Sequence, residues 1–299
     1  MIAGLTEIVG ADRILKQEPM SRHTTFRIGG PADWMILPQN ESQIQAVIHL
    51  LKENKYPYLV LGNGSNILVG DKGIRGAVIQ LGNEFADCRT EGDALIAQAG
   101  IKLSRLANVA LQNGLSGLEF AAGIPGTLGG AIYMNAGAYG GEMADVIASV
   151  TYLNPEGEIC TVNGATCGFG YRTSIFAKND YVILSCKLQL KNGDSDAIRA
   201  VMDDLQERRT SKQPLHLPSA GSTFKRPEGY FAGKLIQDAG LMGFRVGGAS
   251  VSEKHAGFVV NDKGATANDV RTLVEAIQRK VKAEFGVTLE PEVKFIGEF

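Results

Sequence analysis

Apolar residues recur every three to four positions in five stretches of the chain, which is the spacing of one face of an α-helix. The expected helices cover residues 41–54, 103–113, 195–209 and 232–239, with a longer one between Thr266 and Gly286. In the last of these, Thr266 and Asp269 form a capping-box pattern at the start, and Gly286 occupies a favoured stop position. The charged helix at 195–209 is the candidate domain boundary.

Short apolar runs between these segments predict β-strands. The expected strands are residues 58–61, 76–81, 149–153, 158–162, 181–190 and 258–260. The turn residues at 154–157 separate two of them and predict a hairpin with a loop longer than two residues. The chain therefore mixes helices and strands, and no repeat or low-complexity tract interrupts it.

Composition and charge narrow the classes of function. The 299 residues, 44% of them hydrophobic, suffice for two domains with buried cores. A net charge of −2 gives no basic excess to attract nucleic acid or an anionic membrane surface. No signal-peptide pattern and no stretch of membrane-spanning length is present, so we expect a cytoplasmic protein without membrane insertion.

The cysteines and histidines give no support for metal catalysis. Cys88, Cys160, Cys167 and Cys186 form no C-x-x-C pair, and we expect them to be small buried apolar residues. The four histidines are scattered, without the spacing of a zinc site or the order of a hydrolytic triad. No metal is expected.

Two glycine-rich loops offer a different chemistry. The first comprises Gly62, Asn63, Gly64, Ser65 and Asn66, and the second runs from Gly123 to Gly130. Glycine lets backbone N–H groups crowd around a phosphate. Ile67 replaces the third glycine of G-x-G-x-x-G, and neither loop continues into a Gly-Lys-Ser/Thr sequence, which weakens the Rossmann and P-loop interpretations. Taken singly, each loop is more often a plain tight turn, and the presence of two in one chain strengthens the interpretation as a ligand site.

Polar groups concentrate at three further places. Arg172, beside Tyr171, has the chemistry to clamp a carboxylate, although a surface salt bridge is the favoured interpretation from the residue alone. Ser222 lies close to two cations and has a hydroxyl that could hold a substrate oxygen or deliver a proton. The alternative for Ser222 is the cap of a turn, and no G-x-S-x-G elbow supports a covalent acyl-serine mechanism.

The third place is the alternating stretch from Leu289 to Phe295. Period-two alternation puts Leu289, Pro291, Val293 and Phe295 on one face and Glu290, Glu292 and Lys294 on the other. One carboxylate could project into a cleft. The plainer alternative is a solvated edge strand, where Pro291 is tolerated.

These motifs, in this order, resemble the UDP-N-acetylenolpyruvoylglucosamine reductase family over nearly the whole chain. The segments that carry the resemblance are 23–30, 61–66, 123–130, 135–140, 170–172, 220–222 and 292–293. The resemblance implies an α+β fold, with an FAD-binding domain of the vanillyl-alcohol-oxidase (PCMH) type followed by a smaller α+β substrate-binding domain. The implied bounds are 1–195, subdivided near residue 55, and 196–299.

The resemblance also implies the cofactors and their contacts. FAD would be held non-covalently, without attachment to His23, and NADPH would be the co-substrate. The residues placed against the flavin pyrophosphate are Gly62, Asn63, Gly64, Ser65, Asn66, Gly123, Pro125, Gly126, Thr127, Gly129 and Gly130. The compact stretch between Tyr171 and Lys212 resembles the shorter subclass, which lacks an extra tyrosine loop.

The implied reaction reduces the enolpyruvyl group of a nucleotide sugar to give UDP-N-acetylmuramate for peptidoglycan. The resemblance gives Arg172 and a protonated Glu292 the role of stabilising an enolate-like carboxylate, and Ser222 that of proton donor. Tyr171, Lys212, Lys225 and Arg226 are candidates for binding the substrate. Arg226 departs from the family pattern, in which asparagine is frequent.

Two other hypotheses remain distinct from this one. A flavin oxidase would pass electrons to oxygen, and a non-catalytic nucleotide-binding module would keep the glycine loops alone. The presence of Arg172, Ser222 and Glu292 argues against the binding module, and Ser222 with Glu292 argues against the oxidase. The sequence does not indicate an oligomeric state.

Overall fold

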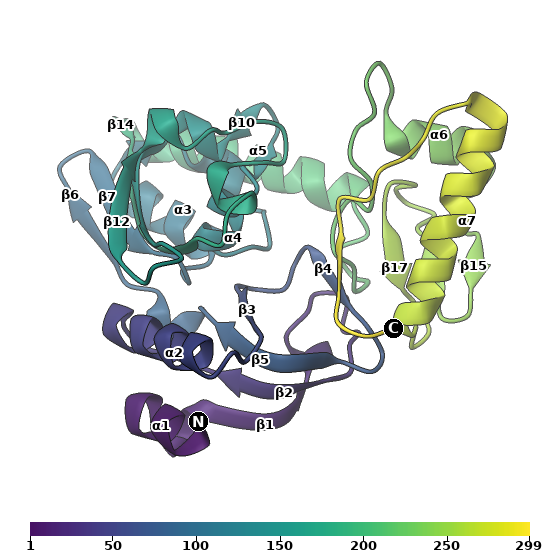
Figure 1. Ribbon diagram of the computed structural model, residues 1–299. Helices are drawn as coiled ribbons and strands as arrows, with labels where there is room; N and C mark the ends of the chain where they lie inside the picture. Colours follow the sequence, from purple (N-terminus) through teal and green to yellow (C-terminus); the bar gives the residue numbers. More distant parts are fainter. The chain divides into compact units, whose positions relative to one another are not determined.

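The computed structural model describes residues 1–299, which divide into two compact units. Unit 1 comprises Met1–Leu15, Met35–Asn63 and Ala77–Arg209. Unit 2 comprises Lys16–Trp34, Gly64–Gly76 and Thr210–Phe299 (Figure 1). This division differs from the domain bounds expected from the sequence, because two segments from the amino-terminal quarter belong with the carboxyl-terminal residues.

Unit 1 is built on a five-stranded antiparallel sheet. Its strand order is β12 (Ile159–Asn163), β11 (Ile147–Leu153), β13 (Val182–Gln189), β7 (Ala94–Gln98) and β6 (Cys88–Glu91). The predicted hairpin is confirmed as β11–β12, with Val150 opposite Val162. Strand β13 lies at the centre, and its apolar residues are buried, whereas Lys187 and Gln189 are exposed, the alternation of an antiparallel strand with one face towards solvent.

The helices of unit 1 include three of those expected. The expected ones are α2 (Glu41–Glu53), α3 (Leu103–Gln112) and α5 (Ser195–Lys212), the last of which crosses into unit 2 at its end. The other two are α1 (Ile2–Val9) and α4 (Leu128–Tyr133). Asn40 caps α2 by accepting a hydrogen bond from the backbone N–H of Gln43. The apolar face of α2 is then fully buried, as its helical spacing predicts.

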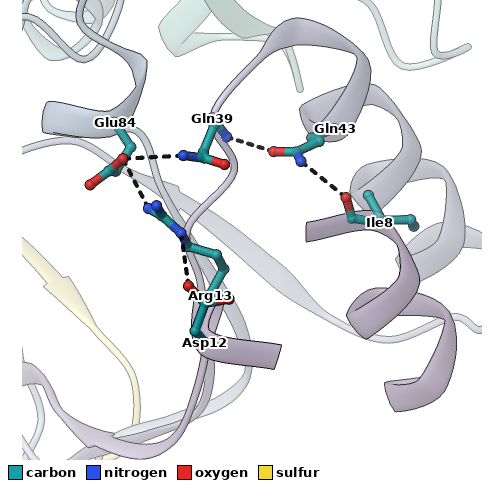
Figure 2. A network of polar contacts seen from close by, with 6 residues as sticks. All are labelled: Ile8, Asp12, Arg13, Gln39, Gln43 and Glu84. Carbon is teal, nitrogen blue, oxygen red and sulfur yellow. Dashed lines mark hydrogen bonds and ion pairs between the residues drawn. The ribbon is translucent and has the colours of Figure 1, made fainter. Parts of the chain in front are cut away.

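A polar network links α1 to α2 and to the segment that carries Glu84 (Figure 2). The side chain of Gln43 donates to the carbonyl of Ile8 at 3.0 Å and accepts from the backbone N–H of Gln39 at 2.8 Å. Arg13 forms an ion pair with Glu84 at 2.9 Å. The hydrogen bond from Arg13 lowers the pKa of Glu84, so the Glu84 carboxylate stays ionised at neutral pH and the ion pair with Arg13 persists.

A four-stranded sheet has the order β1 (Ile14–Pro19), β2 (Pro31–Ile36), β5 (Ile74–Gln80) and β3 (Tyr58–Leu61). Strands β3 and β5 are parallel, with Leu59 opposite Val78. The chain passes from one unit to the other within β1, β2 and β5. The strand predicted at 76–81 is observed as β5, which begins two residues earlier, at Ile74. Two small pairs, β8 (Leu115–Ser116) with β14 (Lys191–Asn192) and β9 (Gly137–Ala138) with β10 (Gly141–Glu142), complete the strands of unit 1.

Unit 2 packs two helices with a small antiparallel sheet. The sheet has the order β15 (Arg245–Val246), β16 (Ala249–Val251) and β17 (Val259–Asn261), and the helices are α6 (Ala232–Asp238) and α7 (Ala267–Phe285). Leu273, Ile277 and Val281 of α7 belong to the core of this unit and are fully buried. Strands β4 (Ile67–Val69) and β18 (Lys294–Ile296) form a separate parallel pair.

The capping box predicted for α7 is confirmed. The Thr266 hydroxyl accepts from the backbone N–H of Asp269 at 3.0 Å, and the Asp269 carboxylate accepts from the backbone N–H of Thr266 at 3.0 Å. Gly286 ends the helix in the left-handed conformation, with φ of 71°.

The expected alternation at 289–295 differs from the structure. Only Lys294–Ile296 form a strand, Phe295 is 37% exposed, and Glu292 is buried although Glu290 is exposed. The two carboxylates that alternation assigned to one face therefore have different surroundings. The backbone of this segment is hydrogen-bonded to residues 223–225. Among the cysteines, Cys167 and Cys186 are buried as expected, whereas Cys88 and Cys160 are half-buried. No helix has the length and apolar character needed to cross a membrane.

Removing the Thr266 cap tests the contribution of the capping box. Thr266→Ala is expected to lower the free energy of unfolding by about 1 kcal/mol, because one backbone N–H at the start of α7 loses its acceptor. Urea unfolding followed by circular dichroism measures the change. Glu275→Ala, at an exposed position of the same helix, is the matched control and should change stability little. Equal losses in both variants would contradict the capping role.

The Asp269 carboxylate predicts a pH dependence of stability. Hydrogen bonds from the backbone N–H groups of Thr266 and Gly248 lower the pKa of Asp269 in the folded protein. Its stabilising contribution is therefore complete above the unfolded carboxyl pKa of about 3.9, and it is lost as pH falls through the lower folded value. Asp269→Asn should flatten the acid loss of stability below about pH 4, measured by urea unfolding at several pH values, whereas the exposed Asp203→Asn should leave the wild-type slope.

Candidate active site

The two glycine-rich loops meet within unit 1. The side-chain amide of Asn63 donates to the carbonyl of Pro125 at 2.6 Å. A Cβ added to Gly62 would overlap the hydroxyl of Thr127. The sequence placed these residues in two separate loops, and the structure brings them into direct contact because Gly62 has no side chain to hold them apart.

Two amides of the second loop point into the protein. The N–H of Leu128 donates to the carbonyl of Ile101 at 2.9 Å, and the N–H of Gly129 donates to that of Ala99 at 2.8 Å. An added Cβ on Gly129 would lie 2.9 Å from the Cβ of Ala99. Gly129 therefore permits close packing of the loop, and its amide is already engaged with Ala99.

Arg209, from the last turns of α5, lies against the second loop. Its Cδ and Nη1 atoms are both 3.1 Å from the position that a Cβ on Gly123 would take. The side chain is half-buried, and its Nε atom is buried without a hydrogen-bond partner. Sequence reasoning missed Arg209, since its position in a charged helix is like that of several other arginines.

Tyr171 and Arg172 form the tip of a tight turn. Gly170 and Thr173 close the turn with reciprocal backbone hydrogen bonds of 3.1 and 3.2 Å. Arg172 has φ of 55°, the positive value that the second central residue of a type II turn adopts. Tyr171 is 57% exposed, and the Arg172 guanidinium lies 5.3 Å from its ring centroid.

The side chain of Asn135 supports this turn through a hydrogen bond to its first residue, Gly170. Its side chain donates to the carbonyl of Gly170 at 3.2 Å and accepts from the backbone N–H of Ala144 at 3.0 Å. Asn135 is 1% exposed and has φ of 46°. A buried side chain with both amide groups bonded, on a strained backbone, is a rigid support. The resemblance singled out the segment 135–140, but the role of Asn135 required the structure.

The serine loop lies in unit 2. Gly221 has φ of 76°, and the following Ser222 is exposed. Thr223 is buried, with its N–H donating to the carbonyl of Gly257 at 2.9 Å and its hydroxyl accepting from the N–H of Val259 at 2.9 Å. The left-handed glycine turns the chain so that Ser222 faces outward while Thr223 anchors the loop.

Glu292 lies next to this loop. Its N–H donates to the carbonyl of Thr223 at 2.8 Å, and its own carbonyl accepts from the side chain of Asn66 at 3.2 Å. Glu292 is 9% exposed. The structure thus brings together within unit 2 the segments of Ser222, Glu292 and the end of the first glycine loop, which are far apart in the sequence.

The candidate cations of unit 2 have different partners. Lys225 forms an ion pair with Glu290. The Arg226 guanidinium stacks 3.9 Å from the ring centroid of Phe231, a cation–π contact. Lys212 is exposed at the end of α5. Tyr171 and Arg172, in contrast, belong to unit 1.

The cysteines and histidines do not gather into a metal site. The structure contains no group of three or more His, Cys, Asp or Glu residues able to hold a metal ion. Burial raises the pKa of Cys167 to about 11, which keeps this thiol neutral and poorly suited as a metal ligand at neutral pH.

Comparison with known families matches both parts of the chain. Residues 213–296 match the family model for the UDP-N-acetylenolpyruvoylglucosamine reductase C-terminal domain, and residues 32–163 match that for an FAD binding domain. The UDP-N-acetylenolpyruvoylglucosamine reductase of Alkaliphilus oremlandii is 53% identical over 294 residues, which cover 98% of this chain and 97% of that protein.

Solved structures agree with the fold. The crystal structure of UDP-N-acetylenolpyruvylglucosamine reductase from Thermus caldophilus matches with a TM-score of 0.81 and 35% identity, over 95% of this chain and 98% of that one. Alkyldihydroxyacetonephosphate synthase matches at a TM-score of 0.50 and 16% identity, over 64% of this chain and 40% of that one. The second match supports the fold alone. The α+β, PCMH-type flavin-binding fold expected from the sequence is confirmed.

Two glycines with the same backbone conformation test the close approach in the first loop. Gly64 has φ of 60° and would place an added Cβ on the carbonyl oxygen of His23, whereas Gly92 has φ of 62° with nothing within 4 Å. Gly92→Ala should cost about 1 kcal/mol for the left-handed conformation alone. Gly64→Ala should cost about 2 kcal/mol more because the backbone must move. Urea unfolding compares them, and equal costs would contradict the crowding at Gly64.

Proposed function

Since the chain belongs to the UDP-N-acetylenolpyruvoylglucosamine reductase family, we propose that it reduces the enolpyruvyl group of UDP-N-acetylglucosamine enolpyruvate, using bound FAD and NADPH as co-substrate. The product is UDP-N-acetylmuramate, a peptidoglycan precursor, and the site of action is the cytoplasm. The observation that carries this proposal is the direct backbone link between Thr223, next to Ser222, and Glu292.

The residues of unit 1 fit the phosphates of FAD. The contact of Gly62 and Asn63 with Thr127 and Pro125 brings the two glycine-rich loops together, and glycine-rich backbone can present N–H groups to a phosphate. Arg209 adds a permanent positive charge beside Gly123, with a buried Nε that still lacks an acceptor. When bound, FAD supplies the hydride transfer from NADPH to the double bond of the substrate. Arg209 would neutralise part of the pyrophosphate charge.

Ser222 is proposed as the proton donor to the carbon next to the substrate carboxylate. Its exposure at a glycine turn leaves the hydroxyl accessible to a ligand. A serine hydroxyl is a weak acid, so it donates effectively only to a strongly basic carbon such as that of an enolate. The buried hydrogen bonds of Thr223 restrict the movement of the neighbouring Ser222.

Arg172 and Glu292 are proposed to stabilise the charge that develops on the substrate carboxylate. The turn that carries Arg172 is held by Asn135 through the carbonyl of Gly170, so the backbone from which the guanidinium extends is fixed before binding. Glu292, which is 9% exposed, is proposed to act as a carboxyl group that donates a hydrogen bond to the substrate. A donor of this kind lowers the energy of an enolate-like carboxylate without adding a negative charge.

Four residues are proposed to bind the nucleotide-sugar substrate. Lys212 and Arg226 are exposed cations with the chemistry to bind a diphosphate. Lys225 forms an ion pair with Glu290, and this ion pair would have to break before Lys225 binds a phosphate. Tyr171, with more than half of its surface exposed, can pack against the substrate beside Arg172.

The visible spectrum of the purified protein under anaerobic conditions tests the proposed reaction. NADPH should bleach the flavin absorption, and UDP-N-acetylglucosamine enolpyruvate should restore it. A flavin band that recovers only in air would indicate an oxidase instead. Absence of bound flavin from protein purified and reconstituted with FAD would contradict the proposed cofactor.

Substitution of Ser222 separates its role from flavin binding. Ser222→Ala should retain flavin and its reduction by NADPH, while reoxidation by the enolpyruvyl substrate slows by at least about a hundredfold, since the proton donor is lost. Rapid-mixing absorbance measures each half-reaction. Ser104→Ala, at an exposed helical serine of unit 1, is the control. Normal reoxidation in Ser222→Ala would sink the assignment. Glu292→Gln should also slow reoxidation selectively, and loss of flavin from it would indicate a structural role.

A further inference from the structure

Thr25 connects two functional segments of unit 2. Its hydroxyl donates to the carbonyl of Ser219 at 2.6 Å, and its backbone N–H donates to the carbonyl of Gly64 at 3.2 Å. The first bond reaches the serine loop and the second reaches the first glycine loop. We propose that Thr25 is a positioning residue, which holds the loop of Ser222 in register with the flavin-binding loop. This inference rests on the proposed function of Ser222.

Thr25 is itself held on both sides. The hydroxyl of Thr24 donates to the carbonyl of Ile28 at 2.9 Å and closes a local turn. The carbonyl of Phe26 accepts from the side chain of Asn261 at 3.0 Å. Phe26 and Ile28 are buried in the core of unit 2. The Thr25 hydroxyl therefore projects from a fixed backbone, which gives a single hydrogen bond more positional effect than one from a mobile loop.

The bond to Ser219 fixes one end of a very short segment. Downstream of Ser222, Thr223 is anchored by Gly257 and Val259. Only Ala220, Gly221 and Ser222 lie between the two anchors, and Ala220 is buried. Because Gly221 is the flexible position of this segment, a fixed carbonyl at Ser219 limits the directions that the Ser222 hydroxyl can take.

The same hydrogen bonds form a closed circuit through Glu292. From Thr25 the circuit passes to Ser219 and along the chain to Thr223, whose carbonyl accepts from the N–H of Glu292 at 2.8 Å. The Glu292 carbonyl accepts from Asn66 at 3.2 Å. Asn66 lies two residues after Gly64, which returns to Thr25. The segments of Ser222, Glu292 and the first glycine loop are thus joined by one set of hydrogen bonds, which we call the frame.

The frame predicts a selective effect of removing the Thr25 hydroxyl. Pro218 stays bonded to the N–H of Asn261 at 2.9 Å, so the loop remains folded without Thr25. The Ser222 hydroxyl then samples more directions, and a small misplacement of a catalytic group slows its step strongly. Thr25 touches no reacting atom in this account, and its effect passes entirely through Ser222.

Thr25→Val removes the hydroxyl at nearly constant shape and tests the inference in the FAD-loaded enzyme. Reoxidation by UDP-N-acetylglucosamine enolpyruvate should slow about tenfold, while reduction by NADPH stays within about twofold of the wild-type rate. The solvent deuterium isotope effect on reoxidation should rise, because proton transfer becomes more rate-limiting. Thr25→Ser keeps the hydroxyl and should restore most of the rate. Thr166→Val, which removes an exposed hydroxyl bonded to the carbonyl of Asn163 in unit 1, is the matched control.

Wild-type rates in both half-reactions of Thr25→Val would overturn the positioning role. Equal slowing of both half-reactions, or no rescue by Thr25→Ser, would overturn it as well, since either result indicates a general structural effect. Thr25→Ala is the second variant without a hydroxyl, and if neither it nor Thr25→Val folds, Thr25 is structural and the proposal fails. Normal reoxidation in Ser222→Ala would instead overturn the proposed function of Ser222, a result that the Thr25 variants leave distinguishable.

Discussion

The approach of Gly64 to the carbonyl of His23 is the constraint on which the functional part of unit 2 depends. An added Cβ would overlap that carbonyl oxygen, and the φ of 60° also favours glycine. With the loop held there, the Gly64 carbonyl accepts from Thr25, and Asn66 reaches Glu292. A larger residue would move the loop, and the hydrogen bonds that join it to the segments of Ser222 and Glu292 would lengthen together.

Unit 1 uses the same principle with different residues. Asn135 and Arg172 both have positive φ values, and the side chain of Asn135 supports the turn that carries Arg172. Non-glycine residues in this conformation cost energy that the surrounding fold must offset. Here the offset comes from buried hydrogen bonds of Asn135 and from the hydroxyl of Ser174, which donates to the carbonyl of Tyr133 at 2.7 Å. The turn that carries Tyr171 and Arg172, the proposed substrate contacts of unit 1, is therefore held rigidly.

The chain has an FAD binding domain without the dinucleotide motif of Rossmann proteins, and we propose that its two glycine loops hold the cofactor. In the second loop, Gly129 serves packing against Ala99, while Gly123 makes room for Arg209. A guanidinium at this position can supply charge that a Rossmann site takes from the start of a long helix. Helix α4, which follows the loop, has only six residues and a correspondingly small dipole.

The sequence by itself determined the elements whose signals are local. Helix α7 begins at its capping box and ends at Gly286 as predicted, and β11 and β12 form the predicted hairpin, because caps and turns depend on residues within a few positions of one another. Ordered motifs along the chain were also sufficient for the family and its fold. Only the tertiary structure decided that Glu292 is buried while Glu290 pairs with Lys225, that Arg209 lies against Gly123, and that Thr25 bonds to Ser219 across 194 positions. Such contacts arise from packing between distant segments, and neither alternation nor helical spacing along the chain encodes which segments meet.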